Sequence, residues 1–172
     1  FEGSRPFAKL LWVKRHRPDV YREAVQVLIS AKDYVCTQLT GAFASDVTSC
    51  STAGLMAIET KQWHTDWLKT MELTHVMWPR ICQAHEQVGV VQAKAAKLSG
   101  FSAGTPVYAG AGDAGSTTLA SGIARDGEFN INLGTSGWVA CTADQVLRES
   151  GVSNLVAMPR QMYINVVPFF NA

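Results

Sequence analysis

Two glycine-rich turns contain residues whose types and spacing are suited to group-transfer chemistry. The first turn, residues 110–115, follows an apolar stretch and presents a single carboxylate, Asp113. The second, residues 134–137, follows the alternating stretch 129–133 and has the sequence Gly-Thr-Ser-Gly. Glycine allows a backbone to approach a ligand closely, and the free N–H groups of such turns can bind phosphate oxygens. A carboxylate on one turn and a phosphate cradle on the other are the groups that phosphoryl transfer to a hydroxyl requires.

Each turn also has an ordinary structural interpretation. Asp113 could simply be the N-cap of the helix that follows it, accepting a backbone N–H two or three residues further on. The stretch 134–137 could be a plain four-residue hairpin loop. Neither turn continues into the Gly-Lys-Ser/Thr of a P-loop, and Ser136 lacks the Gly-x-Ser-x-Gly spacing of a hydrolase nucleophile. The chemical interpretation therefore depends on the two turns together.

The surrounding pattern predicts the elements that position the two turns. Apolar residues recur at helical spacing in the N-terminal half, and strand-like stretches begin at Pro106. Helices are expected at residues 6–17, 18–40 (capped by Gly41), 65–71, 85–99 and 114–124, a turn at 44–51, and strands at 106–110, 128–133, 137–142 and 161–167. Helices followed by strand–helix–strand units indicate an α/β fold, with a domain boundary at the turn 125–127.

Composition excludes several classes of function. The chain is 47% hydrophobic and 17% charged, as globular domains are, and its net charge of +1 offers no basic surface for nucleic acid. No window approaches the ~20 apolar residues of a membrane helix. The four cysteines and four histidines show no metal-ligand spacing. We therefore expect reduced cysteines, a cytoplasmic location, no nucleic-acid or membrane partner and no metal site within this chain.

Asp46, Lys32 and Asp33 are further charged residues that could contribute to a site. Asp46 could face a ligand, but capping of a local turn is the favoured interpretation. Lys32 and Asp33 are expected on a solvated helix face, because adjacent helical residues do not face each other.

Three stretches of the sequence, in order, resemble the signatures of one enzyme family. They are residues 4–16, with a Lys-apolar-x-Trp core; residues 32–46, with the pattern KDY…LTG…SD; and the two turns at 110–113 and 133–137. Together they resemble the FGGY carbohydrate kinases, which include glycerol, xylulose, ribulose and gluconate kinases, and most closely the xylulose kinase branch. The resemblance implies a two-lobed, actin-like ATPase fold with ribonuclease H-like cores. Residues 1–125 would form the end of the sugar-binding lobe, and residues 126–172 the start of the nucleotide-binding lobe.

The resemblance also implies roles for individual residues. Asp113 matches the general base that acts on the sugar hydroxyl. Thr135 and the backbone of Gly134, Ser136 and Gly137 match the turn that binds the phosphates of ATP. Ala114 occupies a position where many xylulose kinases have a sugar-binding Asn and glycerol kinases a Gln. Because alanine has no polar side chain, the identity of the sugar stays open.

The implied partners are a small sugar and ATP with Mg²⁺, and a homodimer is a possible assembly. Members of this family are several hundred residues long, so the chain is expected to lack an upstream phosphate hairpin with an aspartate near the metal, and a downstream adenosine site. We therefore expect the 172-residue chain to be inactive alone. Two alternatives remain: a non-catalytic actin-like domain that binds sugar or nucleotide, and a purely structural α/β domain.

Overall fold

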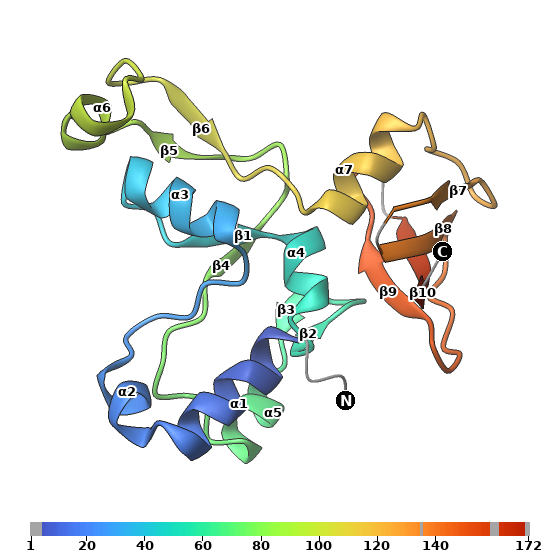
Figure 1. Cartoon of the computed structure of the whole chain (residues 1–172), viewed down its shortest axis with the longest axis horizontal. Helices are drawn as coiled ribbons and strands as arrows, with labels where there is room; N and C mark the ends of the chain where they lie inside the picture. The colour runs from blue at the N-terminus through green and yellow to red at the C-terminus, as the bar shows by residue number, and fades with distance from the viewer. Residues whose placement is uncertain (1–4, 135, 159–161, 171–172) are drawn as a thin grey trace. The chain divides into compact units, whose positions relative to one another are not determined.

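The computed structural model describes residues 5–134, 136–158 and 162–170 (Figure 1). Residue contacts divide the chain into two compact units, Phe1–Gly110 and Ala111–Ala172. Each unit is described by itself. In the described part of the chain, no helix is both long and apolar enough to span a bilayer.

Over its described residues, 5–110, unit 1 combines helices with three small two-stranded sheets. Its helices are α1 (Pro6–His16), α2 (Pro18–Glu23), α3 (Ala31–Thr40), α4 (Val47–Thr52), α5 (Thr65–Thr70) and α6 (Ala93–Ser99). Its strands are β1 (Ala44–Asp46), β2 (Met56–Ala57), β3 (Gln62–Trp63), β4 (Arg80–Cys82), β5 (Gln87–Val90) and β6 (Pro106–Tyr108). β1 and β4 pair in parallel, whereas β2–β3 and β5–β6 are antiparallel.

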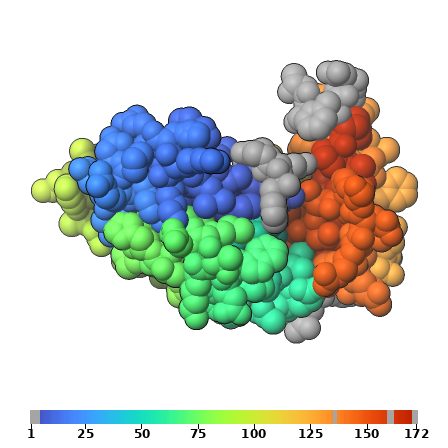
Figure 2. Space-filling model, turned by 90° about the horizontal axis from the view of Figure 1, so that it is seen from below, coloured from blue at the N-terminus to red at the C-terminus, as the bar shows by residue number. Residues whose placement is uncertain are grey.

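The main core of unit 1 joins its N-terminal helices to the segment that contains α5. Phe7 of α1, only 2% exposed, packs in a cluster whose other buried members are Tyr21, Leu55, Leu68, Leu73 and Val76. Figure 2 shows the N-terminal segment lying directly against the segment drawn in green. Burying a side chain of this size contributes ~1.5–3 kcal/mol to folding, so this cluster holds unit 1 together.

Unit 2 contains α7 (Asp113–Ala120) and one antiparallel sheet. The sheet has the order β7 (Phe129–Asn132), β8 (Ser136–Ala143), β10 (Tyr163–Phe170), β9 (Ser153–Val156). β7 and β8 form a hairpin in which Asn132 lies opposite Trp138.

Most of the predicted elements are confirmed. The helices predicted at 6–17, 65–71 and 114–124 are α1, α5 and α7, and the four predicted strands are β6, β7, β8 and β10 within the described residues. Gly41 ends α3 as expected: its φ of +74° is left-handed and its N–H donates to the Thr37 carbonyl at 2.7 Å. Glycine reaches this conformation without steric cost.

The prediction of one helix over 18–40 is wrong, because residues 24–30 leave the helical path. There the backbone pairs with a segment far along the chain: the Val27 N–H donates to the Met77 carbonyl at 3.0 Å, and the Met77 N–H to the Val25 carbonyl at 2.9 Å. Tertiary hydrogen bonds have overridden a helical periodicity that is genuine on both sides of the break.

Two other predictions are also wrong. The helix predicted at 85–99 begins only at Ala93, because residues 87–90 pair with β6 as strand β5. A Cβ at Gly89 would lie 2.8 Å from the Thr40 Cβ, so the glycine lets β5 approach α3. The turn predicted at 44–51 is instead the parallel strand β1 followed directly by α4.

Candidate active site

Asp113 is the first residue of α7 and its side chain is exposed. Gly112 occupies the N-cap position, so the interpretation of Asp113 as the N-cap residue is wrong. Asp113 Oδ1 instead accepts the neighbouring Ala114 N–H at 2.8 Å. Within the described residues the carboxylate forms no ion pair. An exposed carboxylate without a cationic partner is accessible to a ligand hydroxyl.

The turn before α7 starts from a backbone that only glycine adopts readily. Gly110, the last residue of unit 1, has φ +67°, and its N–H donates to the Ala84 carbonyl at 2.9 Å. Both features fix the backbone at the end of unit 1.

The second predicted turn connects β7 to β8. Leu133 is 75% exposed and Gly134 is also exposed, so this end of the hairpin is open to solvent. Thr135 lies outside the described residues, and the backbone of Ser136 begins β8. β7 and β8 thus form a hairpin, as the ordinary interpretation predicted, but Ser136 and Gly137 already belong to strand β8 instead of a four-residue loop. Exposed N–H groups at such a turn can also bind an anion.

Gly137 has a structural reason to be glycine. It lies opposite Phe169 in the β8–β10 pair, and a Cβ at position 137 would collide with the Phe169 ring. Its φ is outside the left-handed region, so backbone strain does not explain the residue. The nearby Phe169 ring therefore explains glycine at this position without a ligand.

The two turns meet the same small core within unit 2. Ala114, next to Asp113, and Trp138, next to Gly137, both pack against one cluster of buried residues: Ala140, Leu155, Ala157, Met162, Ile164 and Val166. The structure therefore brings the start of α7 and the start of β8 onto one face of the sheet. Ala114 is half-buried in this contact, so its methyl group serves packing.

A cluster of three charged residues lies in unit 1, where sequence reasoning expected solvent. Lys32 Nζ lies 2.7 Å from Asp33 Oδ1 and 2.8 Å from Asp46 Oδ2. Both carboxylates are buried, with side chains 1% and 0% exposed. The prediction of a solvated Lys32–Asp33 face is wrong, because Asp33 is buried and the Lys32 ammonium pairs with it and with Asp46.

Both aspartates also hold helix termini. Asp46 caps α4, with Oδ1 accepting the Ser49 N–H at 3.0 Å, so the predicted capping role is confirmed. Asp33 Oδ2 accepts the Ser30 N–H at 3.0 Å at the start of α3. The Ser-x-x-Asp spacing at residues 30–33 resembles a capping box, and this signal could have placed Asp33 correctly.

The two buried cysteines are unreactive thiols, and a metal site is absent from the described residues. Burial raises the pKa of the Cys50 thiol to about 12 and that of Cys82 to about 11, so both stay protonated at neutral pH. The described residues contain no group of three or more His, Cys, Asp or Glu side chains that could hold a metal ion.

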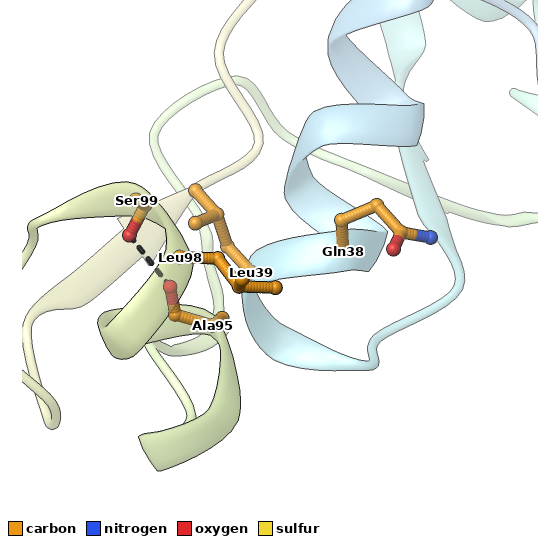
Figure 3. Close-up of a pocket in the computed structure, with 5 residues that line it drawn as sticks. All are labelled: Gln38, Leu39, Ala95, Leu98 and Ser99. Atoms are coloured by element: carbon orange, nitrogen blue, oxygen red, sulfur yellow. Dashed lines mark hydrogen bonds between the residues drawn. The ribbon is translucent and has the colours of Figure 1, made fainter.

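A pocket between α3 and α6 is apolar and contains none of the predicted site residues. It has a volume of about 180 Å³ and is lined by Gln38, Leu39, Ala95, Leu98 and Ser99. Figure 3 shows both leucines between the two helices, while the Ser99 hydroxyl donates to the Ala95 carbonyl at 2.8 Å. With the Ser99 hydroxyl already used, Gln38 is the remaining polar side chain in a lining that is otherwise apolar, whereas a sugar site needs several convergent polar groups.

Comparison with known proteins relates this arrangement to one family. Residues 3–120 match the N-terminal domain of the FGGY family of carbohydrate kinases. Xylulose kinase of Escherichia coli is 30% identical over 159 residues, covering 91% of this chain and 32% of that protein. Autoinducer-2 kinase of Klebsiella pneumoniae is 32% identical over 127 residues, covering 74% of this chain and 24% of that protein.

The fold agrees with these sequence matches. The crystal structure of xylulose kinase from Rhodospirillum rubrum superposes with a TM-score of 0.88 at 25% identity, over 97% of this chain and 34% of that chain. The chain spans about a third of the length of the xylulose kinases it matches. The predicted actin-like ATPase, ribonuclease H-like fold class is thereby confirmed. Since the domain match covers well over half of the sequence, the chain belongs to the FGGY family of carbohydrate kinases.

Proposed function

We propose that the full-length protein is an ATP-dependent carbohydrate kinase that transfers the γ-phosphoryl group of ATP to a terminal hydroxyl of a ketose or polyol. The observation that carries this proposal is the exposed Asp113 carboxylate at the start of α7, outside any described ion pair, in a chain of the FGGY family. A base that accepts a substrate proton must be free of a competing cation and accessible.

In the proposed reaction Asp113 accepts the proton of the sugar hydroxyl as that oxygen attacks the γ-phosphorus. The bond between the γ-phosphorus and the bridging oxygen breaks, and ADP leaves with the electron pair. The products are ADP and a sugar phosphate. Positioning and electrostatic stabilisation account for most of the catalysis in such reactions, so the contribution of Asp113 depends on how its turn is held.

The loop at residues 134–137 is the proposed contact for the ATP phosphates. The exposure of Gly134 supports this role, as does the packing of neighbouring Trp138 on the same small core as Ala114 at the start of α7. Backbone N–H groups of Gly134, Ser136 and Gly137 would donate to phosphate oxygens, together with the Thr135 hydroxyl. Mg²⁺ bound with ATP would neutralise phosphate charge, and the described residues provide no ligand set of their own for it.

The sugar is proposed to be xylulose-like, with the substrate of autoinducer-2 kinase as the second candidate. The similarity to both kinases supports each choice, at 30% and 32% identity. Ala114 packs its methyl group into the core of unit 2, so it supplies no hydrogen bond to select between them. Other residues of the complete protein must make that selection.

Phosphorylation assays on the full-length protein test this function. A panel of xylulose, ribulose, glycerol, gluconate and phosphate-free autoinducer-2 should include at least one substrate that yields ADP and a phosphorylated product. ATP or sugar binding without turnover on the whole panel would favour the alternative, a non-catalytic actin-like binding domain. If the full-length protein neither bound ATP or sugar nor turned over any substrate, the purely structural α/β domain would be the favoured alternative.

Three organisational features belong to the same proposal. Residues 1–125 are assigned to the sugar-binding lobe and residues 126–172 to the nucleotide-binding lobe, which agrees in order with the domain match over 3–120. Use of ATP supports a cytoplasmic location. A homodimer is the proposed assembly, and light scattering of the full-length protein measures it directly.

A further inference from the structure

One face of the sheet in unit 2 packs on the buried core, and the other carries a row of apolar side chains. Directly paired residues of an antiparallel sheet point to the same face. The register therefore places Phe129 and Ile131 of β7 together with Val139 of β8 and Val167 of β10. Leu133 continues the alternation one residue beyond β7. We call these five side chains the outer face.

The outer face is open to solvent at its β7 end. The side chains of Phe129, Ile131 and Leu133 are 63%, 56% and 75% exposed, and that of Val167 is 45% exposed. Single exposed apolar residues are ordinary, whereas large ones on neighbouring strands mark an interaction surface. The four strands of this sheet contain no Asp, Glu, Lys or Arg. A surface that covers the outer face must therefore be apolar as well.

Strand β7 is an edge strand without the features that usually protect an edge. In the sheet order β7-β8-β10-β9, β8 is its neighbour on one side, and no described strand pairs with its other side. Natural edge strands are protected by charged residues, proline or bulges. β7 has the sequence Phe-Asn-Ile-Asn, and its register with β8 is regular. This strand is thus built like an interior strand.

The β9 end of the sheet differs, because the chain covers it with its own loop. Asn154 and Asn165 lie opposite each other in the β9–β10 pair. Asn154 accepts the Leu147 N–H at 2.9 Å and donates to the Leu147 carbonyl at 3.1 Å, while Asn165 donates to the Gln145 carbonyl at 3.2 Å. These bonds hold the loop against one end of the sheet, and the β7 end lacks such a cover among the described residues.

We propose that, in the full-length protein, the rest of the same polypeptide covers the outer face with an apolar surface and pairs with the open edge of β7. The length of the relatives supplies such a segment, because this chain spans only 34% of the Rhodospirillum rubrum xylulose kinase. A second copy is the poorer occupant. A stable dimer buries about 800 Å² and roughly 20–30 residues on each partner, whereas the outer face offers five side chains. A contact within one polypeptide needs less area, because it loses no translational freedom.

Amide-resolved hydrogen exchange of the wild-type full-length protein tests the open edge. Every amide of residues 129–132 should exchange at least about a hundredfold more slowly than in the unfolded chain. An edge strand would protect only alternate amides, because the others point to solvent. The protection should be the same after about a hundredfold dilution of the protein, since a cover from the same polypeptide does not depend on concentration.

Thiol labelling tests the outer face itself. In the full-length protein, the thiol of Ile131→Cys should react with a maleimide at least about a hundredfold more slowly than in the urea-unfolded protein. Leu147→Cys is the matched control, because Leu147 belongs to the same unit and is 47% exposed. Its thiol should react within about tenfold of its unfolded rate. Mass mapping separates each new thiol from the native cysteines.

Three results would overturn the proposal. Free exchange at alternate amides of β7 in the wild type would show an open edge, even if Ile131→Cys fails to fold. Labelling of Ile131→Cys at close to its unfolded rate would show an uncovered face. Protection that disappears on dilution would assign the cover to a second copy. None of these readouts requires kinase activity, so they stand apart from the test of the proposed function.

Discussion

Gly137→Ala should destabilise the sheet of unit 2 through a collision with one identified ring. The added methyl group would overlap the Phe169 side chain across the β8–β10 pair, with the ring atoms Cδ2 and Cζ both 2.8 Å away. Real Cβ atoms do not approach other atoms so closely, so the ring or the strand has to move. Phe169 is half-buried, which leaves it only partial freedom to do so.

Two opposing effects determine how much free energy of unfolding the Gly137→Ala variant loses. Overpacking of a well-packed site costs ~1–3 kcal/mol. Replacing glycine by alanine at a position without left-handed φ stabilises the folded state by about 0.4–1 kcal/mol, because the unfolded chain becomes less flexible. The net loss should be about 1–2 kcal/mol, which corresponds to a roughly 5- to 30-fold increase in local opening.

Native-state hydrogen exchange of the β8 and β10 amides in the full-length protein measures this opening strand by strand. The same substitution is then measured in a Phe169→Ala protein as the matched control, because that protein lacks the ring that the new methyl group meets. In that background Gly137→Ala should cost close to nothing. The difference between the two backgrounds is the coupling energy of the pair.

An equal cost of Gly137→Ala in both backgrounds would refute the packing explanation. The same variant also bears on the proposed phosphate contact, since alanine keeps the backbone N–H. ATP affinity should therefore survive the change. Loss of ATP binding with unchanged exchange would show that the glycine is needed at the phosphates rather than opposite Phe169.

Three other predictions follow from the site and the charge cluster. Asp113→Asn in the full-length enzyme should lower kcat by ~10²–10⁴ with little change in ATP affinity, as loss of a general base does, and near-normal turnover would exclude that role. The 172-residue chain, which spans about a third of its xylulose kinase relatives, should form no detectable sugar phosphate from ATP; measurable product would contradict this. The raised pKa of Lys32 stabilises the fold fully below its ordinary pKa of 10.5, and this contribution should disappear as pH rises through the higher folded-state pKa. The melting temperature of the wild type should thus fall from pH 9 to pH 12 by an amount that the Lys32→Met variant does not lose. Parallel curves of melting temperature against pH for the two proteins would contradict the assignment.

Local patterns in the sequence determined a large part of this protein. The helical spacing of apolar residues identified α1, α5 and α7, and alternation identified β7, β8 and β10. Gly41 was predictable as a helix cap because its left-handed backbone is a local requirement. The stretches 4–16 and 32–46 together with the two glycine-rich turns were sufficient to identify the FGGY family, whose N-terminal domain the chain matches.

Contacts between distant segments decided what these patterns could not. The interruption of the predicted helix at residues 24–30 depends on hydrogen bonds to Met77, and strand β5 depends on pairing with β6. The reason for glycine at position 137 lies in a ring more than thirty residues away. The clearest case is Lys32: a helical lysine is solvated by default, and its charge became structural only because the fold buried Asp33 and Asp46 beside it. A buried charge requires a partner, and only the tertiary structure determines which groups lose their water.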